Sequence, residues 1–195
     1  MIVFLLSCTS IQPGFFVTSV GNPNGGDFGG LEGADARCAS LAEAAGLRDR
    51  GWRAYLSTTE GPVHARDRIG SGPWYNVAGQ MVAADVDDLH LQLSSFDMLN
   101  EYGAEAARGA PPGPEHDILT GSTVDGFAPG PGRTCQDWTS SSPDDLAIVG
   151  HHDWETFVDS AWVENWNQVH AAPCDRPGME RQRGSGRIYC FASDP

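Results

Sequence analysis

The sequence predicts one α+β domain, and three observations carry this prediction: chain length, composition and the order of the expected elements. The chain has 195 residues, which suits one domain and hardly two. Apolar residues make up 40% of it and six residues are tryptophan, so the chain can build a core and is not of the disordered type. The expected elements run strand, helix, strands, a long loop region and strands again, which is typical of an α+β fold.

The first half of the chain predicts a strand, a helix and three shorter strands. Phe15–Val20 is an apolar and β-branched run that predicts a strand, and the glycine-rich segment 21–30 after it predicts a loop. Leu31–Gly46 predicts a helix, because small and apolar residues recur there at helical spacing and a glycine stands at its end. Shorter strands are expected at 52–58, 74–75 and 81–83.

The second half is organised around a long loop region at residues 84–134. A helical turn is expected within Asp87–Leu99, and two stretches rich in proline and glycine follow it, at 109–114 and 128–132. A region of this length with little regular structure is usually functional or mobile. Beyond it, candidate strands are expected at 135–138, 162–170 and 187–192.

The charge of the chain excludes two classes of partner. There are 26 acidic residues against 12 basic ones, all of them arginine, and the formal net charge is −14. Binding of nucleic acid needs a basic face, and docking on anionic lipid needs a polybasic patch. We therefore expect no nucleic-acid partner, and contact with a membrane only through a lipid anchor.

The N-terminus predicts such an anchor. The longest uninterrupted apolar run, Ile2–Leu6, is much shorter than the about 20 residues of a membrane-spanning helix. The sequence Leu-Leu-Ser-Cys that ends at Cys8 resembles a bacterial lipobox, in which the cysteine becomes the lipidated first residue of the mature protein. A buried N-terminal strand with an ordinary cysteine is the alternative. The expected organisation is a truncated lipoprotein signal at 1–8, a tether at 9–14 and the domain at 15–195.

Five cysteines are present, and setting Cys8 aside leaves four that can pair in three ways. No pair has the C-x-x-C spacing of a structural zinc site or a redox motif. Two disulfides in a secreted domain are therefore the simplest interpretation, with free thiols in a cytosolic protein as the alternative. The four cysteines are Cys38, Cys135, Cys174 and Cys190.

Three stretches resemble the endostatin (NC10) domain of collagens. Gly29–Cys38 and the following Trp52–Ser57 are similar to the Gly-Ala-Asp-x-x-Cys helix and the Arg-Ala-(aromatic)-Leu-Ser strand at the start of that domain. Thr134–Ser140 is similar to its Cys-x-x-Trp segment, and Cys174 with Ile188–Phe191 to its closing cysteine pair.

Two further stretches, Ala65–Tyr75 and His116–Ser122, are similar to bacterial lectin-like domains of the same group, which include endostatin-like surface lipoproteins. The resemblance implies an α+β, C-type-lectin-like fold with one main N-terminal helix, small mixed or antiparallel sheets and a long loop region. It also implies two nested disulfides, Cys38–Cys190 and Cys135–Cys174.

The function that this resemblance implies is a non-enzymatic binding module on the outside of the cell envelope. Its ligand would be a glycan or a matrix-type extracellular protein, and the lipid on Cys8 would anchor it. A structural envelope domain without a small ligand is one alternative. An enzyme on a lectin-like fold is another, and no cysteine nucleophile remains for it once four cysteines are bridged.

The candidate ligand-binding residues are aromatic and amide side chains near the third of the four paired cysteines. Aromatic faces beside amide groups suit stacking on a sugar or a hot spot for a protein partner. Packing in the core is the alternative for these tryptophans, and it is the favoured interpretation for Trp52, Trp74 and Trp138. The candidates are Trp154, Trp162, Asn165, Trp166 and Asn167.

No cofactor is expected, and a metal site stays unassigned. Trp166–Gln168 has glutamine where calcium-binding lectins carry the aspartate of a Trp-Asn-Asp sequence, although a structural calcium remains open in so acidic a chain. His116–Asp117 and His151–Asp153 could each supply zinc ligands. Adjacent histidines on a strand point to opposite faces, however, so hydrogen bonding in loops is the favoured interpretation.

Overall fold

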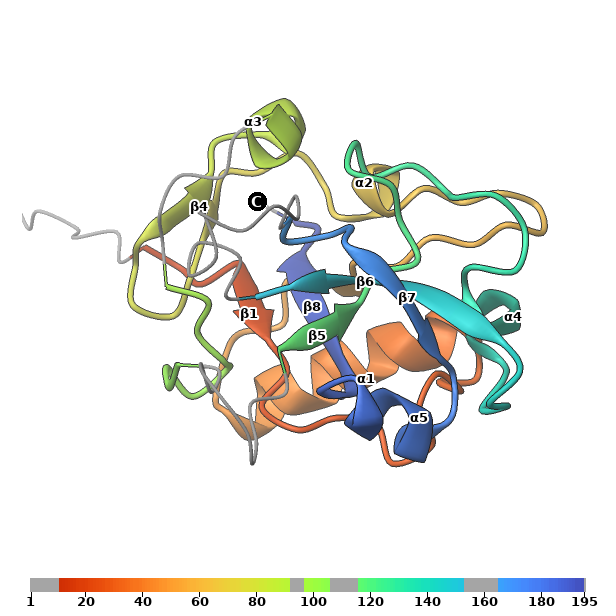
Figure 1. Cartoon of the computed structure of the whole chain (residues 1–195). Helices are drawn as coiled ribbons and strands as arrows, with labels where there is room; N and C mark the ends of the chain where they lie inside the picture. Colours follow the sequence, from red (N-terminus) through yellow and green to blue (C-terminus); the bar gives the residue numbers. More distant parts are fainter. Residues whose placement is uncertain (1–10, 92–96, 106–115, 153–164, 195) are drawn as a thin grey trace, which may run out of the picture.

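Six strands of the described part of the chain form a mixed sheet at the centre of the molecule (Figure 1). This computed structural model describes residues 11–91, 97–105, 116–152 and 165–194. The strand order is β1-β8-β5-β6-β7, β2 also pairs with β8, and β5 and β8 run parallel while the other pairs are antiparallel. The strands are β1 (Phe15–Val17), β2 (Trp52–Ala54), β5 (Asp117–Leu119), β6 (Leu146–His151), β7 (His170–Pro173) and β8 (Gly184–Ala192).

Short helices and a small second sheet surround this centre. The second sheet pairs β3 (Trp74–Tyr75) with β4 (Met81–Ala83). Five helices lie within the described residues, so the expectation of one main N-terminal helix is not borne out, although one of the five, Val86–Leu91, overlaps the helical turn expected within Asp87–Leu99. The four additional helices have four to six residues, which is too short for the apolar repeat that reveals a longer helix in a sequence. The helices are α1 (Gly30–Ala44), α2 (Ala65–Arg68), α3 (Val86–Leu91), α4 (Cys135–Trp138) and α5 (Arg176–Arg181).

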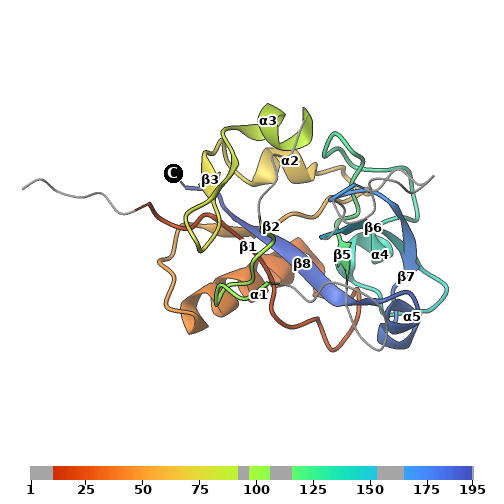
Figure 2. The same cartoon turned by 60° about the vertical axis from the view of Figure 1, so that its left-hand side comes forward.

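Helix α1 packs against one face of the sheet, below β2 and β8 (Figure 2). Its buried residues are Ala34, Cys38 and Ala42, which recur every four residues and so line one side of the helix. It begins after Gly29, whose φ of 76° is in the left-handed region that favours glycine. The structure confirms the expected helix within two residues at each end.

Strand β8 separates the core into two clusters, because alternate side chains of a strand point to opposite faces. Ile188 and Cys190 lie in the cluster between α1 and the sheet, whereas Tyr189 and Phe191 lie in the cluster on the other face of the sheet. Three tryptophans that were expected in the core are buried there: Trp52, Trp74 and Trp138.

Two disulfides join distant parts of the chain. Cys38–Cys190 connects α1 to β8, and Cys135–Cys174 connects the start of α4 to the residue after β7. These are the two pairs that the resemblance implied. Disulfides form and persist in oxidising compartments, so both bridges fit a secreted or extracellular protein.

Two expected strands are absent from the described residues. Cys135–Trp138 forms the single-turn helix α4 rather than a strand, and all four of its residues have positive φ between 50° and 70°. This turn is held by the Cys135–Cys174 bridge and by Asp137, which accepts the backbone amides of residues 59 and 60, and these tertiary contacts cannot be read from the local sequence. Of the expected strand at 162–170, residues 165–169 are not in a strand, and β7 begins at His170.

No helix among the described residues is long and apolar enough to cross a membrane. The first ten residues, which hold the lipobox-like sequence and Cys8, lie outside the described residues. The signal at 1–8 and the lipid on Cys8 therefore stay predictions.

Candidate functional site

The predicted ligand-binding residues lie in two places. Trp154 and Trp162 are outside the described residues, whereas Asn165, Trp166 and Asn167 form the segment that leads into β7. Trp166 is buried, with its ring centroid 4.7 Å from that of Tyr55 and 5.3 Å from that of Tyr189. In this structure Trp166 is a core residue, so its ring offers no open face to a sugar.

Asn167 is fully buried and fixes a loop. Its side-chain amide donates to the Tyr55 hydroxyl at 3.0 Å and to the carbonyls of Thr123 and Val124, each at 3.1 Å. Gln168 accepts a further bond from the Val124 amide at 2.6 Å. The segment that sequence reasoning marked for ligand contact therefore anchors the loop at residues 121–128.

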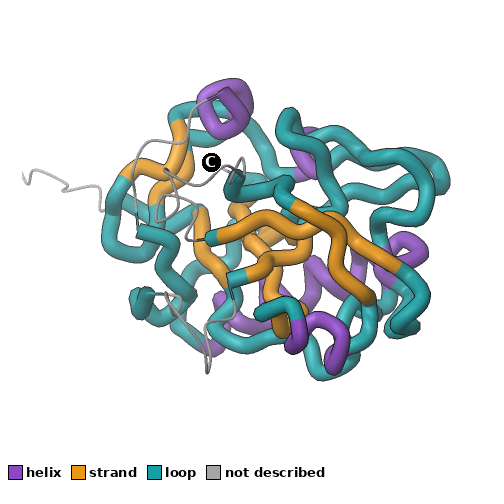
Figure 3. The backbone as a smooth tube through the Cα atoms, in the orientation of Figure 1, coloured by secondary structure: helices purple, strands orange, loops and turns teal. Residues whose placement is uncertain are grey.

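A second loop, residues 55–64 between β2 and α2, lies beside the first. Figure 3 shows both at the edge of the molecule that carries α2 and α4. The Arg66 amide donates to the Gly126 carbonyl at 3.2 Å, and the Ala128 amide to His64 Nδ1 at 2.9 Å. The neighbouring residues 59 and 60 are held by Asp137, which accepts their backbone amides at 2.7 and 2.9 Å. Burial acts to raise the pKa of Asp137, but these bonds and a Thr134 contact outweigh it and lower the pKa.

These two loops present one aromatic side chain to solvent. Phe127 is 43% exposed, the Arg66 guanidinium lies 4.9 Å from its ring centroid, and the His64 ring meets it edge-on at 5.0 Å. We call His64, Arg66 and Phe127 the Phe127 surface. Sequence reasoning missed it, because Phe127 is far in the chain from His64 and Arg66, which lie at the start of α2, and their contact is tertiary.

A different group of residues, which we call the His/Asp cluster, lies where β5, β6 and β7 run side by side (Figure 1). Asp117 begins β5 and pairs across the ladder with His151 at the end of β6. His170 begins β7 and pairs with Val149, two residues before His151, so His170 and His151 are diagonal neighbours on one face. His116 directly precedes β5 and is the fourth member.

The imidazoles of the His/Asp cluster surround one buried carboxylate. The Asp117 side chain is 1% exposed, and its Oδ1 lies 3.1 Å from His116 Nε2 and 3.2 Å from His151 Nε2. Its Oδ2 lies 3.6 Å from His170 Nε2, and the Nε2 atoms of His151 and His170 are 3.3 Å apart. The His116 and His151 rings stack with centroids 4.1 Å apart.

The electrostatics of the cluster stabilise a charged Asp117. Burial acts to raise the pKa of Asp117, but its contacts with His151 and His170 outweigh burial, so the pKa is below the usual value of 3.8. The same contact with Asp117 raises the pKa of His170, against the effect of its own partial burial. The carboxylate and the imidazoles are therefore strongly coupled.

Sequence reasoning found parts of this cluster but not their combination. It named His116–Asp117 and His151–Asp153 as separate sources of metal ligands, and the register of β5 against β6 brings the first pair to His151. His152 is buried but does not belong to the His/Asp cluster, and Asp153 lies outside the described residues. His170 had no local signal, because its place depends on the pairing of β6 with β7.

No protein-family model matches this chain, and a search of curated proteins finds no similar sequence.

Proposed function

We propose that this chain is a secreted, non-enzymatic binding module of the lectin-like, endostatin-like kind, anchored to the outer surface of a cell envelope by a lipid on Cys8. Its ligand is a glycan or an extracellular protein. Two disulfides support the extracellular part of this proposal, and the net charge of −14 supports a partner other than nucleic acid.

The Phe127 surface carries the binding part of the proposal. Both of its loops are fixed from beneath, one by Asn167 and the other by Asp137. Because these loops are already ordered, little conformational entropy is lost when a ligand binds. Rigid loops on a bridged scaffold are the usual site of recognition in domains of this size.

The chemistry of the Phe127 surface suits the proposed ligands. An exposed aromatic ring can stack on the apolar face of a sugar or enter a pocket of a protein partner. Arginine beside an aromatic residue is a frequent composition of protein hot spots, and His64 adds a hydrogen-bonding group at the edge. A structural envelope domain without a small ligand would not depend on this side chain.

An array of glycans and extracellular matrix proteins tests the proposal, with the chain from residue 9 onward as the probe. We expect Phe127→Ala to weaken binding at least tenfold, or about 1.4 kcal/mol, because a central aromatic contact is lost. Tyr102→Ala is the matched control, since Tyr102 is an aromatic residue with 61% exposure on a different loop. Absence of any ligand among the glycans and matrix proteins, or an equal loss of affinity in both variants, would contradict the proposal.

A further inference from the structure

We propose that His116, Asp117, His151 and His170 bind a divalent transition-metal ion of the zinc type. Imidazole and carboxylate are ligands that zinc prefers in proteins. Calcium requires six to eight oxygen ligands, and the His/Asp cluster supplies one carboxylate and three nitrogens, so its donors select against calcium. This site is separate from the Phe127 surface and does not depend on the proposed function.

The separations between the donor atoms match a tetrahedral site. With metal–ligand distances of about 2.0–2.1 Å, two ligands of a tetrahedral zinc ion lie about 3.3–3.4 Å apart. The separations are 3.1 Å and 3.2 Å from Asp117 Oδ1 to the Nε2 atoms of His116 and His151, 3.3 Å between the Nε2 atoms of His151 and His170, and 3.6 Å from Asp117 Oδ2 to His170 Nε2. His116, Asp117 and His151 each offer a donor atom within 4.8 Å of the other two, and His170 approaches this group from its edge.

The carboxylate at the centre is not satisfied by hydrogen bonds. Among the described residues, neither oxygen of Asp117 accepts a hydrogen bond of good geometry, although three imidazole nitrogens lie within 3.6 Å. A buried charge in this position is costly unless a cation compensates it.

A metal ion compensates Asp117 better than protons alone. Protons would have to reside on imidazoles that stack at 4.1 Å, in the case of His116 and His151, and two charged rings at that distance repel each other. A divalent ion instead binds the lone pairs of neutral imidazoles and neutralises the carboxylate. The strands that hold the ligands are paired by backbone hydrogen bonds, so the site is largely formed before the ion arrives.

The site is accessible to an ion from solvent through His170. The His170 side chain is 39% exposed, whereas those of His151 and Asp117 are 6% and 1% exposed. His170 therefore lies at the entrance and completes the coordination of the three more buried ligands. We expect it to contribute less to affinity than His151.

Isothermal titration calorimetry of the metal-free protein with zinc chloride at about pH 7.5 tests the proposal. We expect one equivalent of zinc to bind with a dissociation constant in the micromolar range or tighter, and calcium chloride to give no binding. His151→Ala should weaken zinc binding at least a hundredfold, and Phe127→Ala and the matched control His64→Ala should leave it unchanged. Absence of binding, or wild-type affinity in His151→Ala, would overturn the proposal.

A second variant keeps the test decisive if His151→Ala does not fold. His170→Ala changes a partly exposed residue, and near-ultraviolet circular dichroism reports whether its core is intact. We expect it to weaken zinc binding by roughly tenfold to a hundredfold, and to reduce the visible absorption that tetrahedral cobalt(II) gives in the wild-type site. Unchanged affinity together with an unchanged cobalt spectrum would exclude His170 as a ligand and overturn the site as proposed.

Discussion

Tyr55, His90 and Asn167 form a chain of hydrogen bonds between α3 and the core. His90 Nδ1 lies 2.6 Å from the Val86 carbonyl, which can only accept, so Nδ1 carries the proton. His90 Nε2 then accepts from the Tyr55 hydroxyl at 2.7 Å, and this hydroxyl accepts from Asn167. The arrangement requires a neutral His90, because a second proton on the ring would face the Tyr55 hydroxyl hydrogen.

We expect His90 to contribute to the pH dependence of the free energy of unfolding. Burial and, to a smaller extent, the charge of Arg66 lower the pKa of His90, against the Val86 hydrogen bond and the charges of Asp125 and Asp87, which raise it. The unfolded chain binds this proton near pH 6.5, and the folded chain binds it only at lower pH. We therefore expect the contribution of His90 to be present above about pH 6.5 and lost as pH falls through the lowered pKa.

Urea unfolding of wild type and His90→Gln between about pH 7.5 and pH 5 measures this effect. The free energy of unfolding of the wild type should fall relative to that of His90→Gln as pH decreases. A constant difference between wild type and His90→Gln across this range would show that His90 does not cause the dependence.

Single residues were predictable where burial alone decides their role. Trp52, Trp74 and Trp138 were expected in the core from their places in expected strands, and all three are buried, although Trp138 lies in α4 and not in a strand. The His/Asp cluster was not predictable as a whole, because two of its contacts depend on the register between β5, β6 and β7. A shift of one residue in that register would turn His151 away from Asp117.

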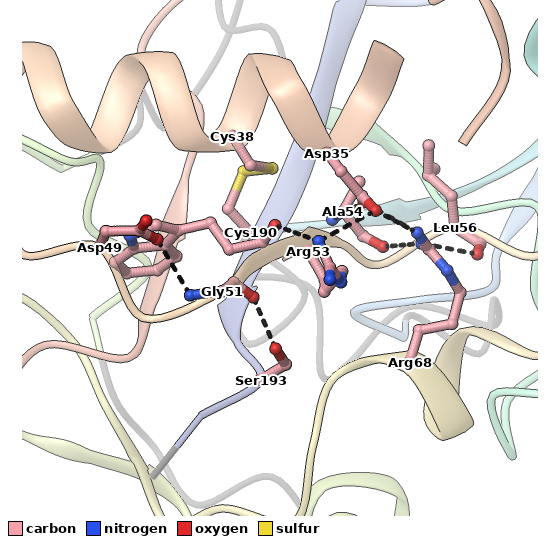
Figure 4. Close-up of polar contacts among 11 residues, drawn as sticks. Asp35, Cys38, Asp49, Gly51, Arg53, Ala54, Leu56, Arg68, Cys190 and Ser193 are labelled. Carbon is pink, nitrogen blue, oxygen red and sulfur yellow. Dashed lines mark hydrogen bonds and ion pairs between the residues drawn. A yellow bond between two sulfur atoms is a disulfide. The ribbon is translucent and has the colours of Figure 1, made fainter. Parts of the chain in front are cut away.

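At the level of elements, Asp35 links α1 to β2 and α2 (Figure 4). Its carboxylate accepts two bonds from Arg68, at 2.7 and 2.8 Å, and one from the Ala54 amide at 2.9 Å. Arg68 donates in turn to the Ala54 carbonyl at 2.6 Å. The Asp35 and Arg68 side chains are 15% and 11% exposed, so solvent screens this pair only weakly.

Asp35→Asn should destabilise the protein by about 2–3 kcal/mol, because it removes a charged acceptor from a largely buried two-bond pair and leaves Arg68 uncompensated. Glu180→Gln is the matched control. This substitution removes the negative charge from the Arg176–Glu180 ion pair, whose side chains are 32% and 54% exposed. It should lower the free energy of unfolding by less than about 0.5 kcal/mol. Urea unfolding of both variants decides the prediction, and equal losses would contradict it.

Elements were predictable where the local pattern is long enough. Helix α1 shows a helical repeat, and the expected strand at 187–192 is contained in β8. Strand β5 was missed, since its three residues, Asp117–Leu119, lie in a region that reads as loop and are strand only through pairing with β6 and β8. The turn at Cys135–Trp138 was misread for the same reason, because tertiary contacts hold its positive φ angles.

For the molecule as a whole, the two disulfides replace part of the stability that a larger core would supply. Cys38–Cys190 joins the longest helix to the strand that separates the two core clusters, so it connects the centre of the fold. Cys135–Cys174 closes a segment that includes β6 and the whole of β7. The same segment holds His151 and His170, so this bridge confines the strands that carry half of the proposed metal ligands.

The two bridges should differ in their effect on stability, because they close loops of different length. Cys38–Cys190 spans 152 residues and Cys135–Cys174 spans 39. In the chain-entropy model these lengths correspond to about 5 and about 4 kcal/mol of stabilisation through the unfolded chain. We therefore expect the double variant Cys38→Ala/Cys190→Ala to lose more free energy of unfolding in urea than Cys135→Ala/Cys174→Ala. The reverse order would mean that packing around the bridged sulfurs in the folded state, rather than the entropy of the unfolded chain, determines what each disulfide contributes.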